Sequence, residues 1–368
     1  MKVEKVSFQN YRNLADGEIS PSGGINIVYG ENGQGKTNLL EAIFMCSGIK
    51  SFRNVSDTDL IKFDCDFAKI NMDYFSNKRV NTIELRLDPK RTANYNKTGF
   101  NPASSVLGKF TAIVFAPVHL KLIQEGPNLR RKFVDGAICQ LIPRYSNILD
   151  DYRRILLQRN QLLKQCSQNA VLKDNLYETI AIWSEKLALA GGEIYIARNR
   201  YIKKLEEAAK KIYKGLSLSR EEISITYEAS IETAAGSAAE YVKDLSESQK
   251  TIIDEEIYKK QTLLGPHRDD IIIKLDGKQM RTFGSQGQQR SAALTLKLAE
   301  AELLTEITGE KPVAILDDVM SELDVTRQDY ILNHLHERQV FISCCDPSQI
   351  ERLVKGKLFH INEGKIKE

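Results

Sequence analysis

The chain has 368 residues, of which 42% are hydrophobic and 27% are charged, and its formal net charge is +3 at pH 7. This composition is ordinary for a soluble globular protein and excludes the collagen-like, disordered and disulfide-scaffold classes. No apolar run approaches the roughly 20 residues that a membrane helix needs, and the lysines of residues 1–10 precede no apolar stretch, so we expect a cytoplasmic protein. The six cysteines show no CxxC spacing, which favours reduced thiols that bind no metal.

Positive charge is concentrated in the middle of the chain. Residues 121–220 contain 19 Lys and Arg against 10 Asp and Glu, a local net charge of +9 that leaves −6 for the remainder. Such an asymmetry is a weak indication of a nucleic-acid partner. A solvated helical surface that is basic without function explains the count equally well.

The first part of the chain predicts strands and one helix. Apolar residues alternate around residues 6–8, and the β-branched run Ile25–Tyr29 ends at Gly30. A helical pattern then extends from Gly35 to Met45. The predicted order is strand, glycine loop, helix.

Two further alternating runs, residues 68–74 and 83–87, predict an antiparallel hairpin with its turn at residues 77–78. Thr111–Ala116 predicts one more buried strand, which Pro117 ends.

The middle of the chain predicts helices. Residues 129–214 contain almost no Pro or Gly, and apolar residues recur at spacings of three and four. We expect an arm of antiparallel helices with a break near Ser167–Ala170. Gly191 and Gly192 are expected to kink or bound a later helix.

The last hundred residues return to a mixed pattern. Ile271–Leu275 predicts a strand followed by a hairpin turn, and Gly284 and Ser285 open a helix over about residues 288–305. Short buried strands at 313–316 and 340–343 flank a helix near residues 326–336. The expected fold class is α/β, with a head split between residues 1–120 and 262–368, an antiparallel β subdomain, and a helical arm or lid domain inserted at residues 121–261.

A phosphate-binding loop lies between the predicted strand and helix. Its glycines and the helix N-terminus free backbone N–H groups to hold phosphates, Lys36 adds a positive charge at the β and γ phosphates, and Thr37 offers a hydroxyl to Mg²⁺. We therefore expect a nucleotide-binding site at Gly30, Glu31, Asn32, Gly33, Gln34, Gly35, Lys36 and Thr37.

Two carboxylates end the strand at residues 313–316. Ligands of open α/β sheets bind at this end of the strands. Asp317 is expected to hold Mg²⁺, directly or through water, and Asp318 to act as the general base toward the attacking water. The alternative is that both residues only cap the strand. Asp318 is a shorter carboxylate than the glutamate common in related machines, which suggests slow turnover.

A second helix N-terminus carries a hydroxyl and a glycine in Ser285-Gln286-Gly287-Gln288-Gln289. It cannot belong to the same phosphate loop. We expect Ser285, Gly287 and Gln288 to contact the γ-phosphate held by a second copy of the chain, which gives two composite sites in a twofold dimer. Residues 321–324 are expected to cross that interface.

Together these motifs resemble the RecF family, bacterial DNA-repair ATPases related to SMC proteins and ABC-type ATPases. One of the matching segments, residues 265–270, is absent from generic ABC-type ATPases. The matching segments are Asn10–Asn13, Gly30–Thr37, Phe115–Pro117, Gly126–Pro127 with Arg130, Arg131 and Phe133, Gly265–Asp270, Ser285–Gln289 and Leu316–Asp324.

The resemblance implies an ABC-type, SMC-like head and an ATP-dependent homodimer with weak, DNA-stimulated ATP hydrolysis. It implies binding to double-stranded DNA near gaps or junctions, the partner RecR, and through RecO and RecR the loading of RecA. It also implies that Arg12 and Asn13 reach the adenine or ribose, where the alternative is a turn that only packs.

The sequence departs from the family pattern at two places. Val118 and His119 replace an expected acidic pair, and Cys344 and Cys345 replace hydroxyl residues. A γ-phosphate-sensing role for residues 343–346 is therefore not predicted.

Two other functions stay open at this point. An ATPase subunit of a transporter is the first, but the basic helical segment shows no evident apolar docking surface. A small-molecule kinase is the second, and it leaves residues 285–289 unexplained. Arg130, Arg131, Arg153 and Arg154 fit either DNA phosphate contacts or internal ion pairs.

Overall fold

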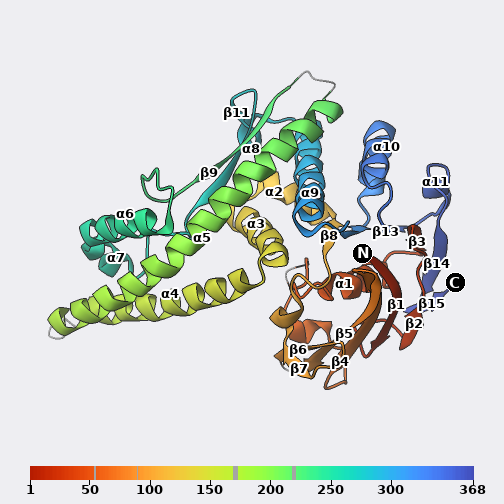
Figure 1. Cartoon of the computed structure of the whole chain (residues 1–368), viewed down its shortest axis with the longest axis horizontal. Helices are drawn as coiled ribbons and strands as arrows, with labels where there is room; N and C mark the ends of the chain where they lie inside the picture. Colours follow the sequence, from red (N-terminus) through yellow and green to blue (C-terminus); the bar gives the residue numbers. More distant parts are fainter. Residues whose placement is uncertain (54, 89, 169–172, 218–220) are drawn as a thin grey trace. The chain divides into compact units, whose positions relative to one another are not determined.

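The computed structural model describes residues 1–53, 55–88, 90–168, 173–217 and 221–368. Its contacts divide the chain into two compact units. Unit 1 comprises Met1–Gln124, Ala208–Ile223 and Met280–Glu368, and unit 2 comprises Glu125–Glu207 and Ser224–Gln279. Figure 1 draws the chain with its elements labelled.

The units differ at three segments from the ranges expected for the head and the arm, the first being residues 121–124, which lie in unit 1. Residues 262–279 lie in unit 2, because β10 (Asp270–Leu275) pairs with β11 (Lys278–Gln279) and with β9 (Ile223–Glu228). Residues 208–223 lie in unit 1, where the carbonyl of Ile212 accepts a hydrogen bond of 2.9 Å from Tyr330. The predicted domain boundaries stay a prediction.

A six-stranded sheet forms the centre of unit 1, in the order β15-β14-β3-β13-β12-β8. All neighbours are parallel except β14 and β15. The strands β12 and β8 are buried along their whole length, as parallel strands covered on both faces are. The bounds are β3 Ile25–Tyr29, β8 Ala112–Phe115, β12 Val313–Leu316, β13 Val340–Cys344, β14 Lys357–Asn362 and β15 Lys365–Lys367.

The predicted strands at 25–29, 111–116, 313–316 and 340–343 are confirmed within a residue or two, whereas β14 and β15 were not predicted. Three main helices belong to this unit: α1 (Lys36–Met45), α9 (Gln286–Thr308) and α10 (Val325–His334). Helix α1 packs against β13 and β8, and α9 also packs against β8. The carboxyl ends of β3, β12 and β13 therefore meet at one edge of the sheet, beside the start of α1.

A second, antiparallel sheet of unit 1 has the order β2-β1-β4-β5-β6-β7. The predicted hairpin is confirmed, because β4 and β5 pair from Ser76 opposite Arg79, and Asn77 and Lys78 form the turn with φ of 51° and 61°. The bounds are β1 Lys2–Gln9, β2 Gly17–Ile19, β4 Ala68–Ser76, β5 Arg79–Asp88, β6 Lys90–Tyr95 and β7 Phe100–Pro102.

Unit 2 is mainly helical. Helices α4 (Arg144–Gln168) and α5 (Lys173–Leu216) lie side by side in Figure 1, and Nε of Arg159 in α4 donates to Ser184 in α5 at 2.9 Å. Ser167 and Gln168 still belong to α4, while the rest of the predicted break lies outside the described residues. The remaining helices here are α3 Pro127–Leu141, α6 Ala238–Thr251 and α7 Ile253–Lys259.

Gly191 and Gly192 are predicted to kink or bound a helix. No helix begins or ends at them, because α5 runs through both, so the predicted boundary is wrong. A Cβ atom on Gly192 would lie 2.8 Å from the carbonyl oxygen of Ala238 and 2.9 Å from Cγ2 of Val242. The glycine therefore serves the close approach of α6 to α5.

Short elements connect the larger ones. They are η1 Asp57–Leu60, η2 Ala103–Val106, η3 Pro117–Leu120, α2 Lys121–Gln124, α8 Met280–Phe283, η5 Met320–Glu322 and α11 Ser348–Glu351.

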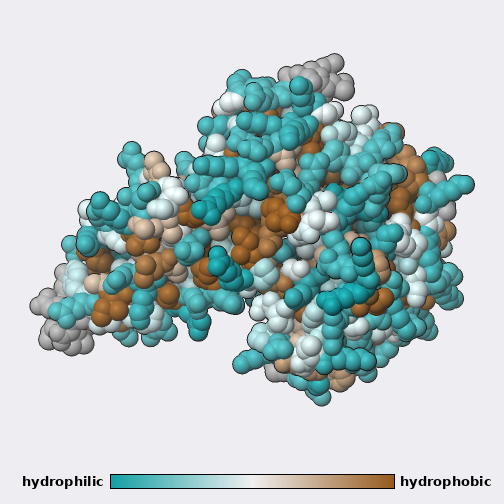
Figure 2. Space-filling model, in the orientation of Figure 1, coloured by the Kyte–Doolittle hydropathy of each residue, from teal (hydrophilic) through white to brown (hydrophobic). Residues whose placement is uncertain are grey.

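None of the helices in the described part of the chain is long and apolar enough to span a membrane. On the face drawn in Figure 2, hydrophilic residues predominate, with apolar patches between them. Leu157 in α4 and Ile182 and Leu189 in α5 are exposed by 68%, 55% and 56%. Three exposed apolar residues do not by themselves make a docking surface, so the prediction that the helical segment offers none stays a prediction.

Candidate nucleotide site

The loop between β3 and α1 depends on three glycines with positive φ. Gly30, Gly33 and Gly35 have φ of 150°, 81° and 118°. A Cβ atom on Gly30 would lie 2.2 Å from the carbonyl oxygen of Ile361, so no other residue fits there. Gly35 precedes α1 and provides no side-chain cap, which leaves the first N–H groups of the helix available to an anion.

Lys36 folds back over this loop. It is only 4% exposed, and its Nζ donates to the carbonyl oxygens of Gly30 at 2.7 Å and Glu31 at 3.0 Å. The same nitrogen lies 3.7 Å from Sγ of Cys345, and that thiol lies 3.2 Å from Oδ1 of Asn32. The loop carbonyls thus hold the ammonium group where phosphate oxygens would approach.

Two neighbouring segments fix the outer side of the loop. The backbone N–H of Gly364 donates to the carbonyl oxygen of Gln34 at 3.1 Å, and that of Glu363 donates to its side-chain oxygen at 2.5 Å. Nδ2 of Asn13 donates to the carbonyl oxygen of Gly33 at 2.9 Å. These contacts fix the backbone of the loop.

The carboxylates after β12 meet the loop. Oγ1 of Thr37 donates to Oδ1 of Asp317 at 2.9 Å, and Oγ of Ser343 lies 2.9 Å from the same oxygen and 3.2 Å from Oδ1 of Asp318. Burial raises the pKa of Asp317 above its ordinary value, although the hydrogen bonds from Ser343 and Thr37 oppose the shift. Asp318 has φ of 50°, a conformation that is strained for a residue with a side chain.

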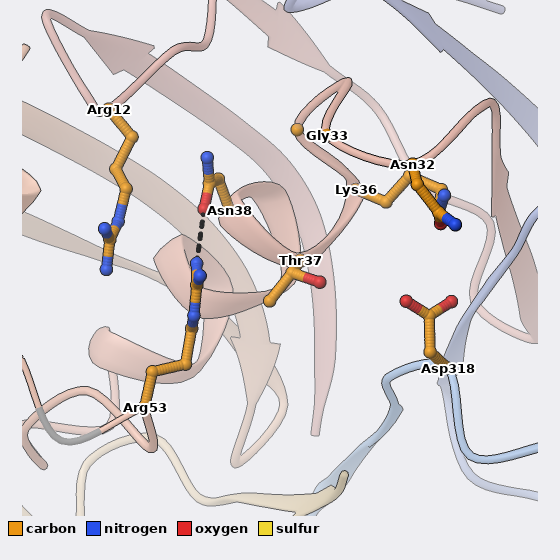
Figure 3. Close-up of a pocket in the computed structure, with 9 residues that line it drawn as sticks. Arg12, Asn32, Gly33, Lys36, Thr37, Asn38, Arg53 and Asp318 are labelled. Carbon is orange, nitrogen blue, oxygen red and sulfur yellow. Dashed lines mark hydrogen bonds between the residues drawn. The ribbon is translucent and has the colours of Figure 1, made fainter. Parts of the chain in front are cut away.

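One pocket of unit 1 collects these groups (Figure 3). Asn32, Lys36 and Asp318 lie toward one end of it, and Arg12 and Arg53 toward the other. Its lining is Arg12, Asn32, Gly33, Gly35, Lys36, Thr37, Asn38, Arg53 and Asp318. The other residues predicted for a nucleotide and Mg²⁺ in this region do not line the pocket. Four of them are hydrogen-bonded to lining residues: Gly30, Glu31, Asn13 and Asp317. Gln34 is hydrogen-bonded to Glu363.

The amino end of α9 carries the other predicted nucleotide contacts. Ser285 caps the helix: its Oγ accepts from the N–H of Gln288 at 3.3 Å, and its own N–H donates to Oε1 of Gln288 at 2.8 Å. The carbonyl oxygen of Gly287 accepts from Arg327 at 3.3 Å. Ser285 is exposed and is not among the residues that line the pocket of its own chain.

Comparison with known proteins decides the family. The model of the RecF/RecN/SMC N terminal domain matches residues 2–366. The chain belongs to the RecF family. It is 37% identical over 364 residues to the DNA replication and repair protein RecF of Acetivibrio thermocellus, a match that covers 98% of each chain. A solved structure, the recombination mediator protein RecF with ATP in the RecFOR pathway, has 34% identity and a TM-score of 0.91 over 100% of this chain and 97% of that one.

The fold is also that of SMC heads. The SMC head bound to the C-winged helix domain of ScpA matches with a TM-score of 0.54 and 16% identity, over 100% of this chain and 96% of that one. The expected fold, an ABC-type and SMC-like ATPase head of mixed α/β structure, is confirmed. Membership of the RecF family argues against the transporter and kinase alternatives.

Residues of the segment Gly265–Asp270 form internal contacts in unit 2. Arg130 makes a two-pronged pair with Asp270 at 2.7 and 2.8 Å, which supports the ion-pair alternative for this arginine. Oδ1 of Asp269 accepts from the backbone of Ser230 at 2.7 Å. His267 contacts Tyr152 at 2.7 Å, and burial lowers the pKa of this histidine to about 4.

One departure from the RecF pattern has a local explanation. His119 is enclosed in η3, where its Nδ1 accepts from the backbone N–H of Ala116 at 3.0 Å. Burial lowers the pKa of His119 well below its ordinary value, and nearby Lys297 adds to the shift.

Four residues at or behind the pocket were not predicted as site residues: Asn38, Glu41, Arg53 and Ser343. Ser343 could have been found, because it ends a predicted buried strand that follows the strand before Asp317 after one helix, and two strands connected in this way usually lie parallel. Asn38 and Arg53 are joined at 2.8 Å (dashed in Figure 3), and Asn38 donates to Asn13 at 2.7 Å. No local signal marks these contacts, since each joins residues from different segments.

Proposed function

We propose that this chain is an ATP-dependent, DNA-binding protein of recombinational repair and replication restart that dimerises around ATP and hydrolyses it slowly. The observation that carries the proposal is that Lys36, Thr37 and Asp318 line one pocket and that Thr37 is hydrogen-bonded to Asp317. The names of its relatives, a DNA replication and repair protein and a recombination mediator with ATP, support the same function.

The nucleotide contacts follow from the loop. Backbone N–H groups of residues 30–35 and the start of α1 would hold the phosphates, and Nζ of Lys36 would exchange a carbonyl partner for phosphate oxygens. Arg12 lines the opposite end of the pocket and would reach toward the nucleoside from there, and Asn13, whose amide contacts Gly33 and Asn38, would approach it beside Arg12.

The oxygen ligands fit Mg²⁺. The hydroxyl of Thr37 and the buried carboxylate of Asp317 are 2.9 Å apart, and Mg²⁺ binds few protein oxygens beside phosphates and water. When bound, Mg²⁺ would neutralise charge on the β and γ phosphates. Ser343 orients Asp317 through its hydroxyl.

Asp318 is the proposed general base. It lines the pocket beside Lys36, and its backbone N–H donates to Oγ of Ser343 at 2.8 Å, which fixes the turn that presents its carboxylate. From this position it would accept a proton from the attacking water.

The dimer would complete each site with Ser285, Gly287 and Gln288 of the other copy. Ser285 is exposed at the start of α9, and the neighbouring apolar residues Phe283 and Val325 are exposed by 70% and 63%. A second copy that covers this surface would bury the apolar side chains and bring the helix N-terminus to the γ-phosphate.

Double-stranded DNA is the proposed nucleic-acid partner, with RecR, RecO and RecA as protein partners in the bacterial cytoplasm. In unit 2, α5 exposes Arg200, Lys203 and Lys204 on one side, at a spacing that one helix face provides. Basic residues at this spacing can contact phosphates without reading sequence.

The decisive experiment measures the molecular mass and the duplex affinity of the purified chain with and without ATP and Mg²⁺, by sedimentation and fluorescence anisotropy. We expect ATP to produce a dimer that binds duplex DNA more tightly, and duplex DNA to stimulate hydrolysis. Lys36→Met should abolish the ATP effects. A wild-type chain that stays monomeric with ATP, or a Lys36→Met chain that still dimerises with it, would contradict the proposal.

A further inference from the structure

Arg12 has an unusual backbone for an arginine. Its φ is 52°, and its N–H donates to the carbonyl oxygen of Leu60 at 3.0 Å. The left-handed conformation costs an ordinary residue about 1 kcal/mol, whereas glycine adopts it freely. The backbone conformation therefore does not favour an arginine at this position, so a role of the side chain must explain why an arginine is present.

The side chain of Arg12 is fixed by Glu41. Nε and Nη2 donate to the two carboxylate oxygens at 2.9 and 3.2 Å, so the guanidinium plane is set by both. Glu41 lies on α1, one turn after Thr37, and its side chain is fully buried.

Two more donors complete the surroundings of this carboxylate. The hydroxyl of Tyr11 donates to Glu41 at 3.1 Å, and the hydroxyl of Ser51 also donates to it. The carboxylate therefore has donors from the segment after β1 and from the segment after α1. Such a fully bonded buried group has one orientation, and it transmits that orientation to Arg12.

Arg12 also lines the pocket. The side chain of Arg12 is 15% exposed and lines the pocket at the end away from Lys36 and Asp318 (Figure 3). Among the residues that the structure describes, none accepts a hydrogen bond from Nη1. This nitrogen is available to a ligand.

We propose that Glu41 is a positioning residue that holds the guanidinium of Arg12 toward bound nucleotide. This inference rests on the proposed binding of ATP. Glu41 does not touch the nucleotide; it fixes which nitrogen of Arg12 can reach it. The helix that begins at the phosphate loop thereby also orients the opposite end of the pocket.

Binding of a fluorescent ATP analogue to the full chain tests the inference. Glu41→Gln keeps the size of the side chain but loses the charge that pairs with Arg12. We expect the affinity to fall about tenfold, which corresponds to the free energy that one charge-assisted hydrogen bond typically contributes. In an Arg12→Ala background, the same change should cause no further loss, because the group that Glu41 orients is absent.

Arg12→Lys provides a second variant that retains the charge in the pocket. A lysine cannot form the two-pronged pair, so we expect a loss similar to that of Glu41→Gln. This variant keeps the test decisive if Glu41→Gln fails to fold.

The matched control is Glu256→Gln in unit 2. Glu256 is also fully buried and pairs with a buried arginine, Arg159, at 2.6 Å. Both Glu→Gln variants should lower the melting temperature, but only Glu41→Gln should weaken nucleotide binding. A tenfold effect from Glu256→Gln would show that affinity follows stability and would overturn the inference.

The inference is also overturned if Glu41→Gln or Arg12→Lys binds like the wild type, or if Glu41→Gln weakens binding equally with and without Arg12. A wild-type chain that binds no ATP would instead refute the proposed function. Titration of the wild-type chain with the ATP analogue therefore distinguishes failure of the proposed function from failure of this inference.

Discussion

The hydroxyl of Thr37 lies 2.9 Å from a carboxylate oxygen of Asp317, although 280 residues separate them along the chain. One residue starts α1 and the other follows β12, and parallel pairing through β13 brings these two ends together. Ser343, at the carboxyl end of β13, lies between the two carboxylates. The arrangement of strands alone therefore assembles the proposed metal and catalytic groups.

Asp318→Asn should separate binding from hydrolysis. Asparagine tolerates the positive φ at this position but cannot accept the proton of water at neutral pH, so we expect normal ATP affinity and about a hundredfold slower hydrolysis. Sedimentation with ATP and duplex DNA should show a dimer that stays on DNA. Unchanged or faster turnover would refute the assignment of Asp318 as the base.

Ser285→Arg should block dimerisation without affecting the pocket of its own chain. The bulky cation would occupy the surface that the second copy must approach, so we expect normal ATP binding by a monomer that ATP no longer assembles. Mass measured by sedimentation with ATP and Mg²⁺ checks this.

The same substitution at Ser237 controls for the lost helix cap. Ser237 caps α6 in unit 2 and accepts from the N–H of Glu240 at 3.3 Å, much as Ser285 caps α9. Loss of either cap costs about 1 kcal/mol. The Ser237→Arg chain should still dimerise with ATP; persistence of the dimer in Ser285→Arg would refute the role of α9.

The local parts of the site were predictable from sequence. The glycine spacing of residues 30–35 and the carboxylates after a buried strand each follow from neighbouring residues, and parallel strands end at one edge. Glu41 was not predictable in this way. It lies among apolar residues of α1, and donors from two other segments, Tyr11 with Arg12 and Ser51, make its burial possible.

Two parts of the fold that could not be predicted from the sequence also depend on contacts between distant segments. Helix α5 continues through Gly191 and Gly192 because close packing of α6 compensates for their low helix propensity. In β14, Phe359 and Ile361 are buried on either side of His360, but the strand is too short for its alternation to stand out. Contacts between distant segments determine the structure at these positions, and the local sequence pattern gives no sign of those contacts.

Acid should destabilise unit 2 through His267. Burial lowers its pKa to about 4 in the folded chain, against about 6.5 when unfolded, so the unfolded state binds the extra proton. The stability is fully present above about pH 6.5 and is lost as the pH falls toward 4, by about 2 kcal/mol between pH 7 and 5.

Urea unfolding of the wild type and of His267→Asn at pH 7 and pH 5 measures this contribution. The variant is expected to be less stable at pH 7, since it loses the contact with Tyr152, but to lose less stability on acidification. Equal losses in the two proteins would contradict the contribution of His267.

Alkylation of Cys345 should block the phosphate pocket. The thiol is exposed and lies 3.7 Å from Nζ of Lys36 and 3.2 Å from Oδ1 of Asn32, so an N-ethylmaleimide adduct would occupy space that the phosphates need. Its neighbour Cys344 is less reactive, because burial raises the pKa of that thiol to about 12.

We expect N-ethylmaleimide to lower ATP affinity in the wild type, and bound ATP to slow modification of Cys345 as followed by mass spectrometry. The Cys345→Ser chain is the control, since Cys65 remains partly accessible there. Its ATP affinity before and after treatment should be the same. An equal loss in that variant would assign the effect to another cysteine, and modification of Cys345 at the same rate with ATP bound would place the thiol outside the nucleotide site.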